Sequence, residues 1–326
     1  MDDYCKRRRG ICMISMLPDD CLFLVFGKLK TKADRDSFGL TCHRFLDVQN
    51  SSRRCLRTSD KCEISSSMIA KLLNRFTRLQ YLGVSTGCRD FSNLIITNKL
   101  PIHGSRLRSL DLSNCFDFSH FDLVDRSYSS IINDAVVASV ASSCPSLSTI
   151  RLHYSCVTDE GINHLATKLG RSLKWVDILG CSQITDLGIS HLTRNCHQLR
   201  ALRITQCHKI AGASILGLPP TLVALHAGEC AFDATLVSGV LVRRSGGGGC
   251  SLEYLDVSFP WYRHQAASLA FGFPATLKVL NLMLCSPVTD ADVINISKGC
   301  PLLQEWNLSG CNLITLLGWK SIASRC

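Results

Sequence analysis

The chain has 326 residues, of which 46% are hydrophobic and 19% are charged, and its formal net charge is +10. This composition excludes a largely disordered chain and suits either two ordinary domains or one long repetitive domain. The sequence contains neither an apolar run long enough to span a membrane nor the pattern of a secretory signal. We therefore expect an intracellular protein, nuclear or cytoplasmic, whose nineteen cysteines are reduced thiols.

Residues 1–14 are expected to form a basic tail, because they contain the only dense basic run, Lys6 to Arg9. Such a run is either a nuclear-localisation signal or a solvated basic tail. The remaining positive charge is spread along the chain rather than gathered on one helix, so we expect no nucleic-acid partner.

Residues 15–60 are expected to form a small all-α domain. A Leu-Pro pair opens the first helix, and four apolar residues at helical spacing follow it on one face. These positions are Leu17, Pro18, Leu22, Val25, Phe26 and Leu29. So short a segment makes a thin core, which leaves apolar surface either for a partner or for packing on the rest of the chain.

Residues 61–326 contain a repeated L-x-x-L-x-L frame. Its nine copies begin at leucines 79, 107, 147, 173, 199, 222, 252, 277 and 303. A period near 26 residues is typical of leucine-rich repeats. We predict a right-handed α/β solenoid in which each unit is a strand, a turn and a helix, with a concave parallel sheet and convex helices. Because Cys326 matches the start of another unit, we expect either a truncated C-terminus or an unusual terminal cap.

A column of cysteines follows the strands, at positions 88, 115, 156, 181, 207, 230, 285 and 311. Catalysis or metal binding needs one special site rather than a column, so we interpret these thiols as small packing groups that donate weak hydrogen bonds in the turns. The Thr-Asp pairs at 158–159, 185–186 and 289–290 are expected to cap helices. No motif of a catalytic, metal or cofactor site occurs, so we predict a non-enzyme without a cofactor.

The pattern C-P-x-L, L-x-L-x-x-C and I-T-D-x-G-I resembles the cysteine-containing leucine-rich repeats. The segment before it resembles an F-box through Leu17-Pro18, Val25-Phe26 and the run from Cys42 to Phe45, where Phe45 stands in place of the family's usual tryptophan. The two together resemble plant F-box/leucine-rich-repeat proteins.

This resemblance implies a non-catalytic substrate-recognition subunit of an SCF-type E3 ubiquitin ligase. The Leu17-Pro18 pair and the four apolar positions that follow it would bind a Skp-type adaptor that joins a cullin–RING ligase. The repeats would bind a protein destined for degradation. Two alternatives stay open, namely a repeat scaffold without a ligase link and a small-molecule receptor of the F-box class.

Candidate substrate-binding residues lie where strand residues alternate with the leucines and therefore face the concave side. An irregular loop after the copy at Leu252 adds aromatic and basic residues. The candidates are Arg151, Trp175, Asp177, Arg203, His226, Tyr254, Asp256, Trp261, Tyr262 and Arg263. The alternative interpretations are an ordinary solvated sheet face and, for the loop aromatics, side chains that fill gaps between irregular repeats.

Overall fold

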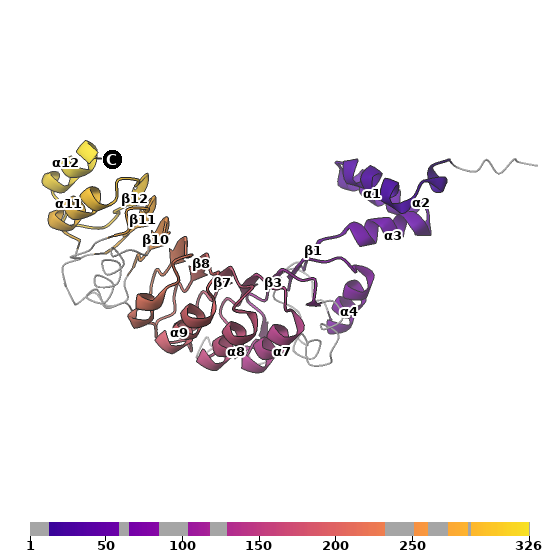
Figure 1. The fold of residues 1–326 in the computed structure, drawn as a ribbon, viewed down its shortest axis with the longest axis horizontal. Helices are drawn as coiled ribbons and strands as arrows, with labels where there is room; N and C mark the ends of the chain where they lie inside the picture. The colour runs from indigo at the N-terminus through magenta and orange to yellow at the C-terminus, as the bar shows by residue number, and fades with distance from the viewer. Residues whose placement is uncertain are drawn as a thin grey trace, which may run out of the picture.

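The computed structural model describes residues 13–58, 65–84, 104–117, 129–231, 251–259, 273–285 and 288–325. Its elements form a curved solenoid with a separate group of helices at the N-terminal end (Figure 1). Among the described residues, no helix combines the length and the apolar character needed to cross a bilayer.

The N-terminal group is a small helical unit with a core of its own. A short 3-10 helix, η1 (Met13–Met16), precedes α1 (Asp19–Lys28), α2 (Lys32–Thr41) and α3 (His43–Ser52). Leu22, Phe26, Phe45 and Val48 are buried together. The ring of Phe38 stacks on that of Phe45 with 4.4 Å between centroids, so aromatic packing compensates for the small size of the core.

The repeats form one parallel sheet of ten described strands, in the order β1-β2-β3-β6-β7-β8-β9-β10-β11-β12. Each of the nine predicted copies contributes one strand. The strands are β2 (Tyr81–Gly83), β3 (Ser109–Asp111), β6 (Thr149–Arg151), β7 (Trp175–Asp177), β8 (Ala201–Arg203), β9 (Ala224–His226), β10 (Tyr254–Asp256), β11 (Val279–Asn281) and β12 (Glu305–Asn307). The predicted fold class is confirmed.

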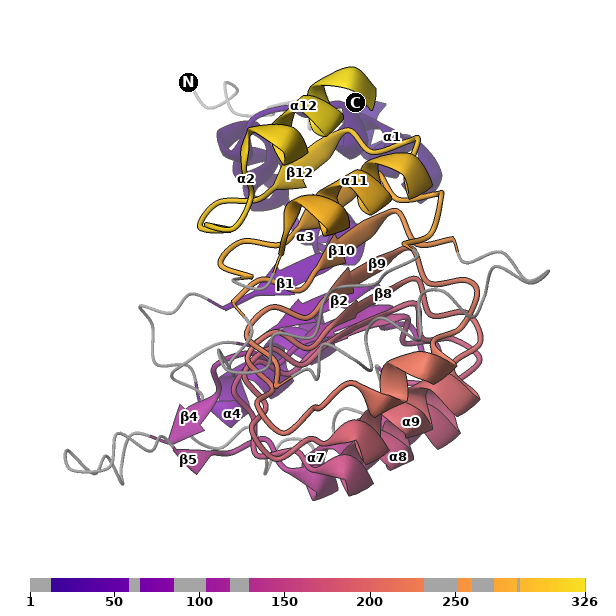
Figure 2. The same ribbon diagram turned by 90° about the vertical axis from the view of Figure 1, so that its left-hand side faces the viewer.

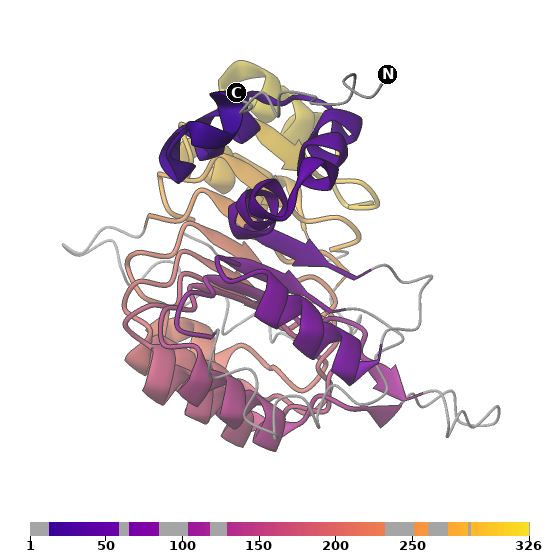
Figure 3. The same cartoon turned by 90° about the vertical axis from the view of Figure 1, so that its right-hand side faces the viewer.

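The first strand of the sheet, β1 (Cys55–Arg57), lies inside the range 15–60 that the sequence predicts as helical. It pairs in parallel with β2, with Leu56 opposite Leu82. The chain therefore leaves α3 and enters the sheet within a few residues, and the helical unit lies directly beyond the first strands (Figure 3).

Helices cover the convex side of the sheet (Figure 1). They are α4 (Ser66–Arg75), α7 (Asp134–Ser143), α8 (Asp159–Leu169), α9 (Asp186–Asn195), α11 (Asp290–Gly299) and α12 (Leu316–Arg325). The unit that begins at Leu199 carries only a 3-10 helix, η3 (Ala213–Gly217), because it is three residues shorter than the unit before it. The short antiparallel strands β4 (Phe116–Asp117) and β5 (Ser129–Ser130) bracket an insertion and project from one side of the solenoid (Figure 2).

The cysteine column has the structural role that the sequence predicts. The thiol of Cys181 donates to the carbonyl of Leu152 at 3.0 Å, and that of Cys207 donates to Ile178 at 3.1 Å. Each thiol thus links its own turn to the residue that directly follows the strand of the preceding unit. Cys156 departs from the prediction, since it is exposed and the buried residue before it, Ser155, occupies the column position.

The Thr-Asp pairs cap helices and also connect neighbouring repeats. Thr185 accepts from the amide of Leu187 at the start of α9, as predicted. The first residue of α8, Asp159, instead accepts from the amide and hydroxyl of Thr185 at 2.8 and 2.6 Å and from the amide of Gly188 at 2.9 Å. One carboxylate therefore satisfies free amides of the following helix.

Candidate protein-binding surfaces

The first candidate surface is the exposed side of the helical unit. Pro18 is exposed, and Leu17, Val25 and Leu29 are half-buried. Leu22 and Phe26 lie in the core of the unit, where they support the predicted adaptor-binding face from beneath. Arg44 fixes the start of α1 through an ion pair of 2.7 Å with Asp19.

Three exposed apolar side chains of this unit are absent from the sequence-based prediction. Leu24 is 69% exposed, Leu40 is 85% exposed and Met16 is 71% exposed. The sequence feature that could have predicted Leu24 is the unbroken apolar run from Leu22 to Phe26. Such a run makes a helix apolar on more than one face, and the face that does not pack in the core needs a binding partner to cover it.

The second candidate surface is the concave face of the sheet. The strand register places Asp111, Arg151, Asp177, Arg203 and His226 in one column, as predicted from the repeat frame. The same column continues through the remaining strands with Asp256, Asn281 and Asn307. The neighbouring column contains Trp175 and Tyr254, so the predicted residues of the strands are brought together on one face.

An ionic cluster lies at the centre of this face. Asp177 is only 2% exposed, and its carboxylate lies 3.8 Å from the guanidinium of Arg151 and 4.0 Å from that of Arg203. His153, which the sequence frame does not single out, brings Nε2 to 2.9 Å from the same carboxylate. Arg151 also covers the ring of Trp175 at 5.2 Å. We call these five residues the concave cluster.

The concave cluster contains polar atoms that lack a hydrogen-bond partner. Oδ1 of Asp177, Nε of Arg203 and Nε2 of His153 are buried without one, so the His153–Asp177 contact is a close approach without the geometry of a hydrogen bond. Unpartnered buried atoms carry a desolvation cost that a bound polar group would relieve. The side chains of Arg151 and Arg203 are 26% and 40% exposed, so these are the donors of the cluster that a partner can reach.

Other residues of the same column have local structural roles. Asp256 accepts from the amide and hydroxyl of Ser258 at 3.0 and 2.7 Å, which stabilises the turn after its strand. His226 packs on the ring of Tyr254 with 4.3 Å between centroids. Burial, and then the charge of Arg203, lower the pKa of His226, so the neutral imidazole is favoured there.

The predicted loop residues Trp261, Tyr262 and Arg263 lie outside the described residues, as does Cys88. Among the residues that the structure does describe, no group of three or more His, Cys, Asp or Glu side chains is arranged to hold a metal ion.

The fold and these surfaces define a leucine-rich-repeat solenoid that begins with a small helical unit. A family profile described as "Leucine Rich repeat" matches residues 299–323. F-box/LRR-repeat protein 12 of Arabidopsis thaliana is 35% identical over 303 residues, which cover 89% of this chain and 72% of that protein. The chain therefore belongs to the family of F-box/LRR-repeat proteins.

Two more distant similarities are also found. F-box/LRR-repeat protein 4 of Bos taurus is 23% identical over 76% of this chain and 30% of its own length. Among solved structures, the leucine-rich-repeat-containing protein LegL7 of Legionella pneumophila aligns with a TM-score of 0.47 and 9% identity over 83% of this chain and 90% of that one.

Proposed function

We propose that this chain is the substrate-recognition subunit of an SCF-type E3 ubiquitin ligase. The observation that carries the proposal is its 35% identity, over 89% of its length, to an F-box/LRR-repeat protein. The helical unit at residues 15–60 would be the F-box that binds a Skp-type adaptor, and the repeats would bind the protein to be ubiquitylated.

In this proposal the chain performs no covalent chemistry. It holds a protein substrate beside a ubiquitin-loaded enzyme, so the rate increase comes from proximity. The short connection between the two parts supports this role: α3 ends two residues before β1, and Arg75 of α4 donates to Asn50 of α3 at 2.9 Å.

The adaptor surface would combine the predicted Pro18 and Val25 with the exposed Leu24 and Leu40, because these side chains leave apolar area for a partner to bury. The substrate surface would be centred on the concave cluster. Its mixed charges beside an indole ring suit a polar protein surface.

The test of the adaptor surface is co-purification with a Skp-type adaptor. We expect the double variant Leu17→Ala with Pro18→Ala, and separately Leu24→Lys, to abolish co-purification while the circular dichroism spectrum stays unchanged. Leu187→Lys on α9 is the matched control, since this leucine is 55% exposed but lies on the repeats. Undiminished adaptor binding by both variants would overturn the F-box assignment.

A further inference from the structure

Four consecutive strands carry an apolar row on the concave face of the sheet. The register places Trp175, Ala201, Ala224 and Tyr254 side by side on β7, β8, β9 and β10. Among the strands that the structure describes, Trp175 is the one large hydrophobic side chain that is exposed. We call these four residues the apolar row.

The two alanines of the apolar row stand between two aromatic rings. Neighbouring strands are about 4.8 Å apart, so the Cα atoms of Trp175 and Tyr254 are about 14 Å apart. Ala201 and Ala224 are only half-buried, and their side chains are short. A large apolar side chain of a partner that lies on the alanines therefore contacts aromatic surface at either end, and its burial favours binding.

Arg203 lies next to the apolar row and is less well paired than Arg151, the other arginine at the centre of this face. Arg151 lies 3.9 Å from the carboxylate of Asp111 and 3.8 Å from that of Asp177, and it also covers the ring of Trp175. Arg203 has only the shared carboxylate of Asp177, at 4.0 Å, and its Nε has no hydrogen-bond partner. Its exposed guanidinium can therefore accept a second carboxylate.

The surroundings of Arg203 leave its positive charge as the one that a partner meets beside the apolar row. On the neighbouring strand, burial and then the charge of Arg203 lower the pKa of His226, so the imidazole stays neutral at pH 7.5. One strand further, the carboxylate of Asp256 is bonded to Ser258. Charge complementarity thus favours an acidic partner at this place.

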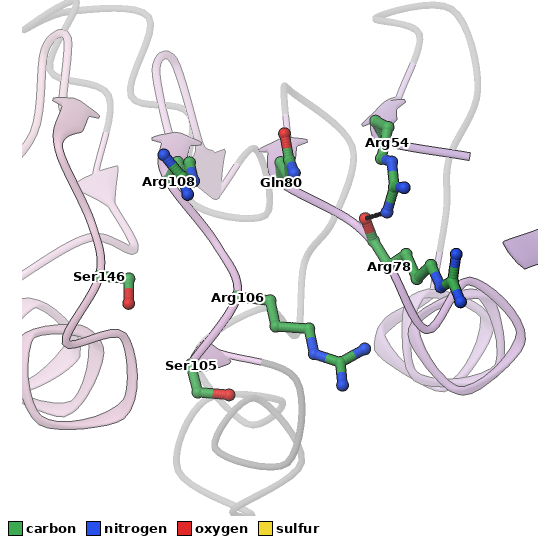
Figure 4. A pocket seen from close by; sticks show the side chains of 7 residues that line it. All are labelled: Arg54, Arg78, Gln80, Ser105, Arg106, Arg108 and Ser146. Atoms are coloured by element: carbon green, nitrogen blue, oxygen red, sulfur yellow. Dashed lines mark hydrogen bonds between the residues drawn. The ribbon is translucent and has the colours of Figure 1, made fainter. Parts of the chain in front are cut away.

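A second group of arginines does not converge in this way. A pocket of about 450 Å³ lies where the first strands begin, and its lining includes Arg54, Arg78, Arg106 and Arg108 (Figure 4). Their guanidinium groups point in different directions, and those of Arg54 and Arg106 already donate to backbone carbonyls at 3.2 and 3.0 Å. The concave face at β7–β10 therefore offers the better defined contact for a partner.

We propose that the apolar row and Arg203 bind an extended segment of the captured protein in which a large apolar side chain and a side-chain carboxylate stand two residues apart. Ala201 and Arg203 are themselves two residues apart on β8, or about 7 Å. Alternate side chains of an extended partner have the same spacing and point to the same side. The apolar side chain would lie on the alanines, and the carboxylate would pair with the guanidinium fork.

The two contacts need each other. A carboxylate alone gains little at an exposed arginine, because water and salt screen the pair. An apolar side chain alone would bind any exposed hydrophobic segment without selection. Joined on one backbone, the second contact forms at a high effective concentration once the first is made. The pair of side chains therefore gives both affinity and selectivity.

The proposal rests on the proposed function, because it describes the captured substrate, and it is tested without an adaptor. The full chain is titrated at pH 7.5 by fluorescence anisotropy against degenerate peptide mixtures with blocked ends, so that every carboxylate is a side chain. One mixture has a fixed Leu-x-Glu and another a fixed Glu-x-Leu, since the direction of the segment is free. Comparison mixtures replace the glutamate with glutamine or the leucine with alanine.

We expect one of the two orders to bind at least tenfold more tightly than both of its comparison mixtures. A hydrogen bond to a charged group and a buried leucine side chain are each worth about a factor of ten or more. Raising the salt concentration should weaken binding of the glutamate mixture and leave the glutamine mixture nearly unchanged, because only the first contains the ion pair.

The variant Ala201→Glu tests the site without removing any contact of the fold. It places a carboxylate of the chain itself beside Arg203, so we expect peptide binding to weaken at least tenfold while the urea midpoint stays within error. Trp175→Ala should also weaken binding about tenfold, and it changes no charge. Val279→Glu on β11 is the matched control, since it adds the same charge to the same column beyond Tyr254 and should leave binding unchanged.

Several results would overturn the proposal. They are equal binding of the glutamine mixture, full binding by the Ala201→Glu variant, or an equal loss in the Val279→Glu control. Absent peptide binding alongside intact adaptor co-purification refutes this inference and leaves the ligase role in place. Peptide binding without adaptor co-purification supports the site and refutes the ligase role alone.

Discussion

Replacing Asp177 with asparagine is the sharpest test of the concave cluster. The substitution preserves the size of the side chain and removes its charge. Its carboxylate is 2% exposed and lies within 4.0 Å of the guanidinium groups of Arg151 and Arg203. An asparagine amide at this place would turn a donor toward side chains that are themselves donors.

The expected magnitude follows from these distances. Two opposite charges 4 Å apart interact by about 4 kcal/mol at an effective dielectric constant of 20. Breaking a fully buried pair costs about 3–5 kcal/mol, because it leaves an uncompensated charge. Arg151 and Arg203 keep 26% and 40% of their side-chain exposure and can be rehydrated. We therefore expect Asp177→Asn to lower the free energy of unfolding by about 2 kcal/mol.

Urea unfolding followed by circular dichroism measures this loss. With a slope of about 3 kcal/mol/M, the transition midpoint should fall by about 0.7 M. Asp256→Asn is the matched control, since the retained amide oxygen can still accept from Ser258. If the two variants shift the midpoint equally, the ion pairs of Asp177 contribute nothing specific and the reasoning is wrong.

Three further predictions test how the repeats are held together. Asp159→Ala should destabilise the chain by about 2 kcal/mol, because three donors of the next unit lose their acceptor, whereas Glu160→Ala, at an exposed position, should change little in the same urea assay. His226→Gln should reduce the stability lost on acidification. Since burial lowers the pKa of His226 from 6.5, the unfolded chain binds more protons below that pH, and this part of the stability is present above pH 6.5 and lost below it. Equal pH slopes for wild type and variant between pH 7.5 and 5.5 would contradict this. Finally, iodoacetamide should label Cys156 but not Cys181 in the native protein, as read by mass spectrometry, because Cys181 is buried and burial raises its pKa to about 11; labelling of both at similar rates would refute the buried column.

The repeat frame predicts the solenoid because its regularly spaced leucines are the residues that the stacked units bury. In each copy of the L-x-x-L-x-L frame, the second and third leucines are two residues apart and point into the core. The residue between them therefore points to the concave face, which is where Asp177 and Arg203 lie. The first strand escapes prediction for the same reason: around Leu56 there is one buried leucine and no frame. Pairing with β2 alone makes this segment a strand.

Contacts between units are less visible in the sequence. Asp159 looks like a residue that caps its own helix, yet its acceptors serve the helix of the next unit, because helix starts lie side by side in the stack. The pocket lined by Arg54, Arg78 and Arg106 is similar, since these residues are scattered over fifty-three positions and only the stacking of the units brings them together. The sequence pattern therefore predicts the structure of each repeat well, but it does not predict which side chains of neighbouring repeats contact each other.

Affinity capture under proteasome inhibition tests the central claim most directly. Wild type and the Leu17→Ala, Pro18→Ala double variant are captured in parallel, and the half-lives of the co-purifying proteins are measured in cells that express each. The account predicts proteins that are captured by both forms, degraded with the wild type and stabilised by the variant. If the captured proteins turn over at the same rate with either form, this chain does not act as a substrate-recognition subunit.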